Sequence, residues 1–265
     1  MTTRTKSRSL ARCIATATIV FAAALTGHAQ QKDPGAETQA EPPIEPRAAS
    51  ILDRAMAHLA NAGQYSTTAE VWQDLVQEDG TKLQFTKYVD IRLRRPDRLR
   101  VEVRTTVPKR SFYYDGKSLT YHDPQKDFYG VVDAPDTIDA MIAEVVEKLG
   151  VEFPLEDIML SKPFGKGAAA AKSGSYLGLD PVLGKACHHL AFQAEAISWQ
   201  VWIEDGPVPA LRKAVITFRE EEGSPQYTAL FEDWDMQTKL ADFVFTHEPP
   251  AGSLKIEFER IETSE

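Results

Sequence analysis

Apolar and polar residues alternate along much of the chain between residues 65 and 132, and this pattern predicts β-strands with one apolar and one wet face. Aspartate-glycine pairs at Gly80, Gly116 and Gly206 mark tight hairpin turns, where a positive φ is required. Strand patterns resume between residues 176 and 258. Successive hairpins of this kind predict one large antiparallel sheet.

A different spacing interrupts the strands at residues 135–149, where apolar residues form a stripe along one side of a predicted helix. Burial of this stripe is worth about 10 kcal/mol gross, so we expect the helix to lie on the apolar face of the sheet. Its apolar residues recur every three or four positions, as on one face of an α-helix that starts at Pro135 and stops at Gly150: Ile138, Met141, Ile142, Val145, Val146 and Leu149.

Three further segments complete the fold prediction. Ser50 is suited to cap a short helix that ends at Gly63. Residues 153–160 add a second apolar cover, and the glycine-rich residues 164–174 predict a loose surface loop. The predicted fold class is α+β, with a large antiparallel sheet and helices on one of its faces.

The N-terminus predicts export. Basic residues precede an apolar run from Cys13 to Leu25, and small residues follow it. The run has thirteen residues, fewer than the roughly 20 of a membrane-spanning helix, so we interpret residues 1–29 as a cleaved signal peptide. The mature protein is expected in the periplasm.

The rest of the chain divides into a linker and a domain. Residues 30–48 are polar and proline-rich, as in a disordered linker, and residues 49–265 form the predicted folded domain. Removing residues 1–29 leaves 26 basic residues against 39 acidic ones. Because nucleic-acid binding depends on clustered Lys and Arg, we expect no nucleic-acid partner.

Cys187, His188 and His189 form the stretch that most resembles a metal or catalytic site. Neighbours on a strand point to opposite faces, so Cys187 and His189 share one side and His188 lies on the other. A metal needs three or four converging ligands, and the other histidines of the mature chain are scattered. A nucleophilic Cys187 would need a base, and His189 is poorly aimed for that task. We therefore expect no metal, no cofactor and no catalytic residue, in a protein that is not an enzyme.

Several stretches resemble proteins of the LolA-like superfamily, which are periplasmic lipoprotein carriers: RPDRLR at 95–100, YDGKSLTYHDP at 114–124 and FY at 128–129. With GKACHHL at 184–190 and WQVWI at 199–203, the chain resembles more closely a family of predicted periplasmic proteins of unknown function in that superfamily. The likeness covers most of residues 50–260. It implies that the sheet curves into a half-open β-barrel, with helices covering its concave face and an apolar cavity beneath them. No residue matches the functional arginine in the carriers' cavity, so we assign that role to no residue of this chain.

The resemblance implies binding of a lipid, or of the acyl chain of a lipoprotein, under a helical lid at residues 136–160. The expected partners are that lipid and, transiently, an envelope protein or membrane acceptor. The alternative is a periplasmic sensor or envelope-assembly factor that binds a protein partner, with the cavity as packed core. The residues expected to contact a ligand lie on the apolar face of the strands and on the inner stripe of the helix: Leu83, Phe85, Leu99, Val101, Val103, Phe112, Leu119, Tyr121, Ile138, Met141, Ile142, Val145, Leu190, Phe192 and Val201.

Overall fold

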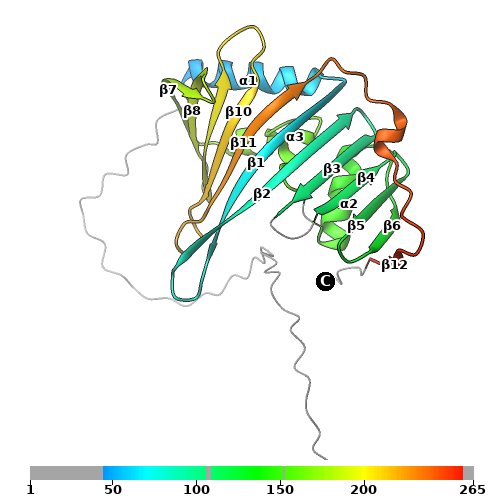
Figure 1. Ribbon diagram of the computed structural model, residues 1–265. Coiled ribbons are helices and arrows are strands. Elements are labelled where there is room, and N and C mark those ends of the chain that lie inside the picture. Colours follow the sequence, from blue (N-terminus) through cyan, green and yellow to red (C-terminus); the bar gives the residue numbers. More distant parts are fainter. Residues whose placement is uncertain (1–43, 106–108, 152, 259–265) are drawn as a thin grey trace, which may run out of the picture. The chain divides into compact units, whose positions relative to one another are not determined.

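The computed structural model describes residues 44–105, 109–151 and 153–258, which lie in one structural unit, Ala40–Glu265. The predicted signal peptide and most of the predicted linker fall outside these residues. Twelve strands of the described chain form a single sheet (Figure 1). They are β1 (Gln64–Val76), β2 (Lys82–Arg94), β3 (Arg98–Arg104), β4 (Lys109–Tyr114), β5 (Ser118–Asp123), β6 (Phe128–Asp133), β7 (Ser173–Val182), β8 (Lys185–Gln193), β9 (Ile197–Glu204), β10 (Leu211–Phe218), β11 (Gln226–Asp235) and β12 (Leu254–Ile256).

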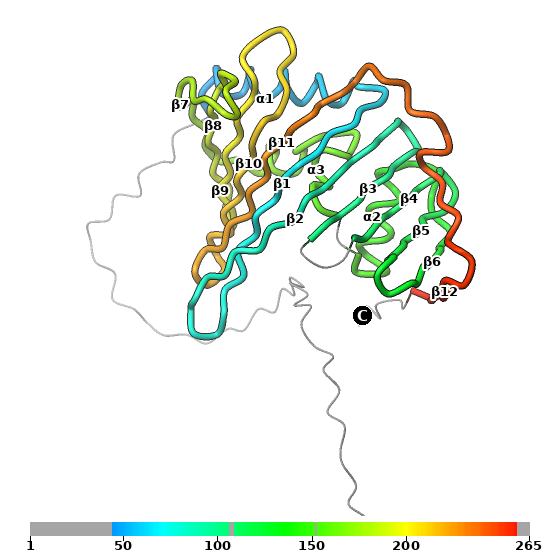
Figure 2. The backbone as a smooth tube through the Cα atoms, in the orientation of Figure 1, coloured from blue at the N-terminus to red at the C-terminus, as the bar shows by residue number. Residues whose placement is uncertain are grey.

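The sheet has the strand order β12-β6-β5-β4-β3-β2-β1-β11-β10-β9-β8-β7. Pairing of β1 with β11 joins the two halves of the chain, and all neighbours are antiparallel except β6 and β12, which are parallel. The sheet curves without closing, so β12 and β7 remain its two edges (Figure 2). The predicted α+β half-barrel is confirmed, with one parallel pair added.

The aspartate-glycine turns form where the sequence predicts them. Gly80, Gly116 and Gly206 all have positive φ angles. At Gly116 a second constraint applies, because a Cβ atom there would lie 2.8 Å from a carboxylate oxygen of Asp97. The Asp115 carboxylate accepts hydrogen bonds from the backbone N–H groups of Lys117 and Ser118, which fixes the turn.

The helices are α1 (Pro46–Asn61), α2 (Ile138–Leu149), α3 (Glu156–Met159) and α4 (Gly165–Ala170), with a short 3-10 turn, η1 (Asp242–Phe245). Side chains of α1, α2 and α3 belong to one buried apolar cluster with residues from a single face of the sheet. We call this the inner face. Figure 1 shows α2 and α3 behind the strands as drawn.

Helix α2 carries its predicted stripe with one exception, but it begins at Ile138, after the Thr137 cap, and not at Pro135 as predicted. The hydroxyl of Thr137 accepts a hydrogen bond from the N–H of Ala140, and Gly150 ends the helix with φ 61°. The inner stripe from Ile138 to Val145 is buried. Val146, predicted in the same stripe, is 37% exposed, because it lies one helical step beyond the contact with the sheet.

Two other helix predictions are wrong in position. Helix α1 begins at Pro46, not at Ser50, because proline is well suited to the first turn and no side chain caps the helix. Residues 164–174 were expected to be a loop, but they contain α4 and the start of β7. Helix α4 has no buried residue, so it carries no apolar periodicity by which the sequence could reveal it.

The C-terminal segment after β11 returns across the outer face, opposite the helices. The guanidinium of Arg94 donates to the carbonyl of Leu240 and pairs with Asp242, and Phe245 is fully buried. His247 lies between the rings of Tyr113 and His122, with ring centroids 4.6 and 4.4 Å away. Across the described residues, every helix is too short or too polar to pass through a membrane.

Candidate functional site

The predicted ligand-binding residues gather on the inner face. All of them except Leu83 and Phe85 belong to the buried apolar cluster or pack against it. Val103 and Tyr121 are partly buried, and the others in the cluster are nearly inaccessible to water. They therefore form one continuous apolar contact between the inner face of the sheet and the helices, and their contact with a ligand stays a prediction.

Leu83 and Phe85 lie on the same face but past the reach of the helices. Leu83 pairs with Leu75 and Phe85 with Gln73, on the part of the β1–β2 hairpin that projects beyond the core. Leu83 is 42% exposed, Phe85 56% and Leu75 47%. Three exposed apolar side chains on the inner face thus form a rim, defined here as Leu75, Leu83 and Phe85.

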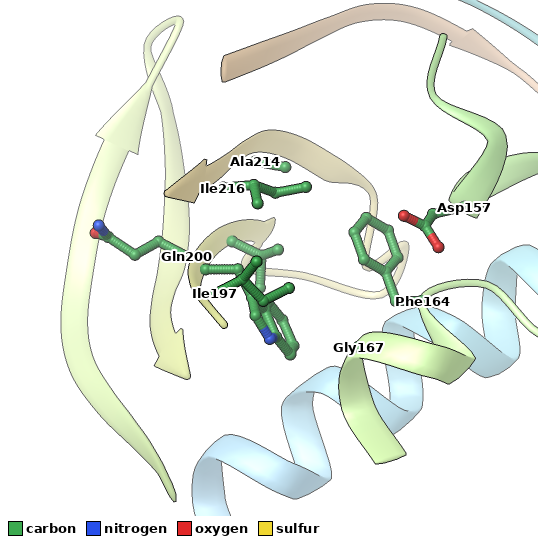
Figure 3. Close-up of a pocket in the computed structure, with 9 residues that line it drawn as sticks. Asp157, Phe164, Gly167, Ile197, Gln200, Ala214 and Ile216 are labelled. Atoms are coloured by element: carbon green, nitrogen blue, oxygen red, sulfur yellow. The ribbon is translucent and has the colours of Figure 1, made fainter. Parts of the chain in front are cut away.

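A cavity of about 30 Å³ lies between the inner face of β9 and β10 and the α3–α4 segment (Figure 3). The Gln200 side chain points away from the cavity in Figure 3 and bonds His189 on the outer face instead. The walls are mainly apolar, and the residues that line the cavity are Asp157, Phe164, Gly167, Ile197, Trp199, Gln200, Val201, Ala214 and Ile216.

Strand register brings the cavity walls together. Trp199 of β9 pairs with Ile216 of β10, and Val201 pairs with Ala214. Ile216 pairs in turn with Tyr227 of β11, which continues the same row of the sheet beyond the cavity. Tyr227 pairs with Gln73 of β1, and Gln73 pairs with Phe85 of β2. The cavity and the rim therefore lie along one row of paired residues on the inner face.

Trp199 presents a buried donor to this cavity. The residue is 4% exposed, and its indole N–H has no hydrogen-bond partner among the described residues. Its ring stacks on Phe192, with 4.1 Å between centroids. Buried polar groups are nearly always hydrogen-bonded, so an orphaned donor beside a void indicates a position for an oxygen atom that is not part of the chain.

Asp157 supplies a second polar group, and its carboxylate lies beside the Phe164 ring (Figure 3). Burial raises the pKa of Asp157, and the positive charge of Lys166 partly opposes this. Burial also raises the pKa of Tyr227, with a further contribution from the Asp157 charge. The cavity therefore combines a donor and a desolvated carboxyl group at one end of an apolar surface, and the phenol of Tyr227 lies on the next strand of the same row.

The two parts of the helical cover over the cavity are held differently. Helix α3 buries Ile158 and Met159, and the Tyr65 hydroxyl donates to the carbonyl of Ile158, whereas α4 has no such anchors. Leu155 and Phe164, which precede α3 and α4, have φ angles of 63° and 52°. Left-handed backbone at residues other than glycine costs of order 1 kcal/mol or more. Helix α4 has no buried residue and packs against the inner face through Ala168, while a Cβ atom added to Gly167 would lie 3.9 Å from Trp199.

A family described as "Predicted periplasmic protein (DUF2092)" matches residues 48–259. The chain belongs to the DUF2092 family. The resemblance expected from the sequence motifs is thereby confirmed, and none of the curated proteins matches the chain.

Solved structures similar to this DUF2092 chain include the lipoprotein LppX of Mycobacterium tuberculosis, at 12% identity and TM-score 0.45, covering 74% of this chain and 100% of that one. A LolA superfamily protein from Nitrosomonas europaea has 10% identity and TM-score 0.36, covering 76% and 97%. The MucA/MucB complex of Pseudomonas aeruginosa has 12% identity and TM-score 0.45, covering 76% and 61%.

In this DUF2092 chain the Cys-His-His stretch has the predicted alternation. Cys187 and His189 face outward, where His189 stacks on Trp202 at 4.0 Å between centroids. His188 contacts Tyr176 and Asp205 instead. Burial raises the pKa of the Cys187 thiol, which donates to the carbonyl of Lys185. In the described parts of the chain, no three His, Cys, Asp or Glu side chains are grouped as metal ligands.

A wider groove of about 440 Å³ lies on the outer face, over Trp202, Lys213 and Leu230. Its lining is more polar than that of the inner cavity, and both faces of the Trp202 ring are in use. His189 stacks on this ring, and the Lys213 ammonium lies 4.5 Å from its centroid. This groove offers no buried orphaned group, so the inner cavity is the better candidate site.

Val201 is the only predicted ligand-binding residue that lines the inner cavity. Trp199 and Ile197 share its strand and face, so the same alternation could have revealed them. Asp157 and Gly167 carry no such signal. They reach the cavity only because the chain between α2 and β7 folds back over β9 and β10.

Proposed function

We propose that this protein binds the acyl chain of a lipid or lipoprotein between the inner face of its sheet and the helical segment from α2 to α4. The observation that carries the proposal is the nature of the cover. An apolar inner face, continuous with an exposed apolar rim, is covered by helices and not by strands, and the α4 part of this cover has no buried residue.

The energetics support reversible binding. A chain of about fourteen methylenes gains roughly 11 kcal/mol when it leaves water, at about 0.8 kcal/mol per methylene. Displacing α4 exposes little apolar surface, because none of its six residues is buried. The cavity of about 30 Å³ is far smaller than such a chain, so uptake requires the cover to move outward.

The proposed role is that of a carrier or binding protein, and the family description supports the periplasm as its location. Residues 1–29 would be removed on export, and the rest of the predicted linker before α1 would act as a spacer. The binding domain, predicted from residue 49, would start with α1 at Pro46. Opening of the cover at an acceptor membrane or envelope protein would release the ligand. Catalysis is not part of the proposal, since the buried thiol of Cys187 has a raised pKa and His189 is bonded to Gln200.

Uptake of a fluorescent long-chain acyl ester tests this function. Met141 is a fully buried residue on the inner side of α2, so Met141→Asp should abolish uptake while the strand signal in circular dichroism persists. Val146→Asp, on the exposed side of the same helix, should take up the probe as the parent protein does. Equal uptake by Met141→Asp and the parent, or no uptake by the parent, would count against acyl binding.

A second candidate function, binding of a protein partner, is favoured by the free edge of the sheet. Strand β7 exposes Leu177 (55%) and Leu179 (58%), and the following turn exposes Leu183 (54%). Exposed apolar edge strands invite pairing with another chain. Under this alternative, Leu179→Lys abolishes capture of the partner and leaves uptake of the acyl ester unchanged.

A further inference from the structure

The inner cavity differs from the rest of the apolar face because it ends in polar groups. Trp199 Nε1 is an orphaned donor in a residue that is 4% exposed, and the Asp157 carboxyl group lies at the same small void. A cavity that held only the carbon atoms of an acyl chain would need neither the indole donor nor the carboxyl group. Both groups are desolvated, so an atom that satisfied them would gain more than it would in water.

The size of the cavity limits what fits between these groups. About 30 Å³ exceeds the 10–15 Å³ or so that one water-sized atom requires, and it is far below the volume of a chain. The void therefore matches one oxygen or one amide group. The apolar walls at Ile197 and Ile216 continue from it toward the partly exposed side of the sheet.

The chemistry of the two polar groups selects the kind of head that fits. An indole N–H donates only, so it requires an acceptor on the ligand. A carboxylate accepts, and it repels a second carboxylate placed beside it. A neutral group that both accepts and donates satisfies both partners, whereas an ionised fatty acid satisfies only Trp199.

We infer that the cavity between Trp199, Asp157 and Gly167 is a head-group subsite for a lipid whose acyl chain ends in a neutral hydroxyl or amide. Trp199 donates to the oxygen of that group, and Asp157 accepts its O–H or N–H. The chain extends over Ile197, Ile216 and Tyr227 toward the rim. This inference rests on the proposed acyl binding and adds a preference among ligands to it.

The test is competition against the bound fluorescent ester by hexadecanol, hexadecanamide and hexadecanoate, at about pH 8, where a free carboxylic acid is ionised. The parent protein should bind the alcohol and the amide about tenfold more tightly than the anion. Trp199→Phe keeps the ring on Phe192 but removes the donor. It should weaken binding of the alcohol and the amide about five- to tenfold and leave the anion unchanged.

Two more variants complete the design. Asp157→Asn should strengthen binding of hexadecanoate and reduce the preference of the site. Ala169→Leu, on the exposed side of α4, should preserve the ranking of the three competitors. Equal affinity of all three for the parent, with no change in Trp199→Phe, overturns the subsite and leaves acyl binding intact. Failure of the fluorescent ester to bind overturns both.

Discussion

The indole nitrogen of Trp199 faces Gly167 across the inner cavity, at a distance that would put a Cβ atom on Gly167 3.9 Å from that nitrogen. This is ordinary van der Waals contact, so glycine is not required to avoid a clash. Because Gly167 has no side chain, space remains beside the Trp199 indole N–H, which has no hydrogen-bond partner among the described residues. The cavity thus depends on one position of α4 as much as on the strands beneath it.

Gly167→Leu should fill the cavity from the helix side. Leucine favours a helix by about 0.5–1 kcal/mol over glycine, so the free energy of unfolding should stay the same or rise. The affinity for hexadecanol should fall about tenfold, because the subsite for its hydroxyl is occupied. Isothermal titration beside Ala169→Leu checks this, and full affinity in a folded Gly167→Leu protein would show that the head group lies elsewhere.

Met141→Ala should destabilise the protein by about 2–5 kcal/mol, since a fully buried side chain is replaced by a small one at the contact between α2 and the sheet. Val146→Ala, on the exposed side of the same helix, should change the free energy of unfolding by no more than about 0.5 kcal/mol. Urea unfolding of both variants measures the difference. Equal effects would mean that α2 does not rest on the sheet through its predicted stripe.

The fold could be predicted from the sequence where the local pattern and the tertiary environment agree. Alternation gave the strands, and the three-to-four spacing gave α2, because both patterns arise from burial of one face. Phe85 marks the limit of this reasoning. Its alternation assigns it to the inner face, but alternation says nothing of how far along a strand the helices extend, and Phe85 is 56% exposed.

The site could be predicted only in part, because the cavity depends on tertiary contacts. Val201 followed from its strand pattern, whereas Asp157 and Gly167 come from segments without periodicity. No local signal states that α4 crosses β9 and β10. At Cys187 the sequence suggests a site that the fold does not form. His188 and His189 are possible metal ligands or bases beside the thiol, but alternation along the strand separates the side chains.

Phe85→Ser should leave stability within about 0.5 kcal/mol of the parent, since the side chain is exposed. If the acyl chain reaches the rim, affinity for the fluorescent ester should fall about fivefold, the cost of roughly one methylene contact or more. Tyr88→Ser is the matched control, because Tyr88 is an exposed aromatic residue of the same strand on the outer face. Equal affinity of all three proteins would exclude the rim from binding.

Acid should loosen the C-terminal segment around His247. Burial lowers the pKa of His247, and His122, Arg100 and Lys109 lower it further, while Glu102 opposes them. The folded protein therefore takes up a proton on His247 at lower pH than the unfolded chain, whose histidine has a pKa near 6.5. The free energy of unfolding should fall as pH drops through about 6.5 and below.

His247→Phe keeps a ring between Tyr113 and His122 and removes this titration. Urea unfolding at about pH 7.5 and about pH 5.5 should show a smaller acid loss in the variant than in the parent. An identical loss in both proteins would place the acid sensitivity at other groups.

The central claim is that the inner face binds a lipid, and the most direct measurement is mass spectrometry of an organic extract. The mature protein would be purified from the periplasm of an exporting host, beside an unrelated exported protein. The account predicts a stoichiometric lipid or acylated peptide, with a neutral hydroxyl or amide head, found only with this protein. A clean extract, with no uptake of a fluorescent acyl ester added afterwards, would contradict it and favour binding of a protein partner.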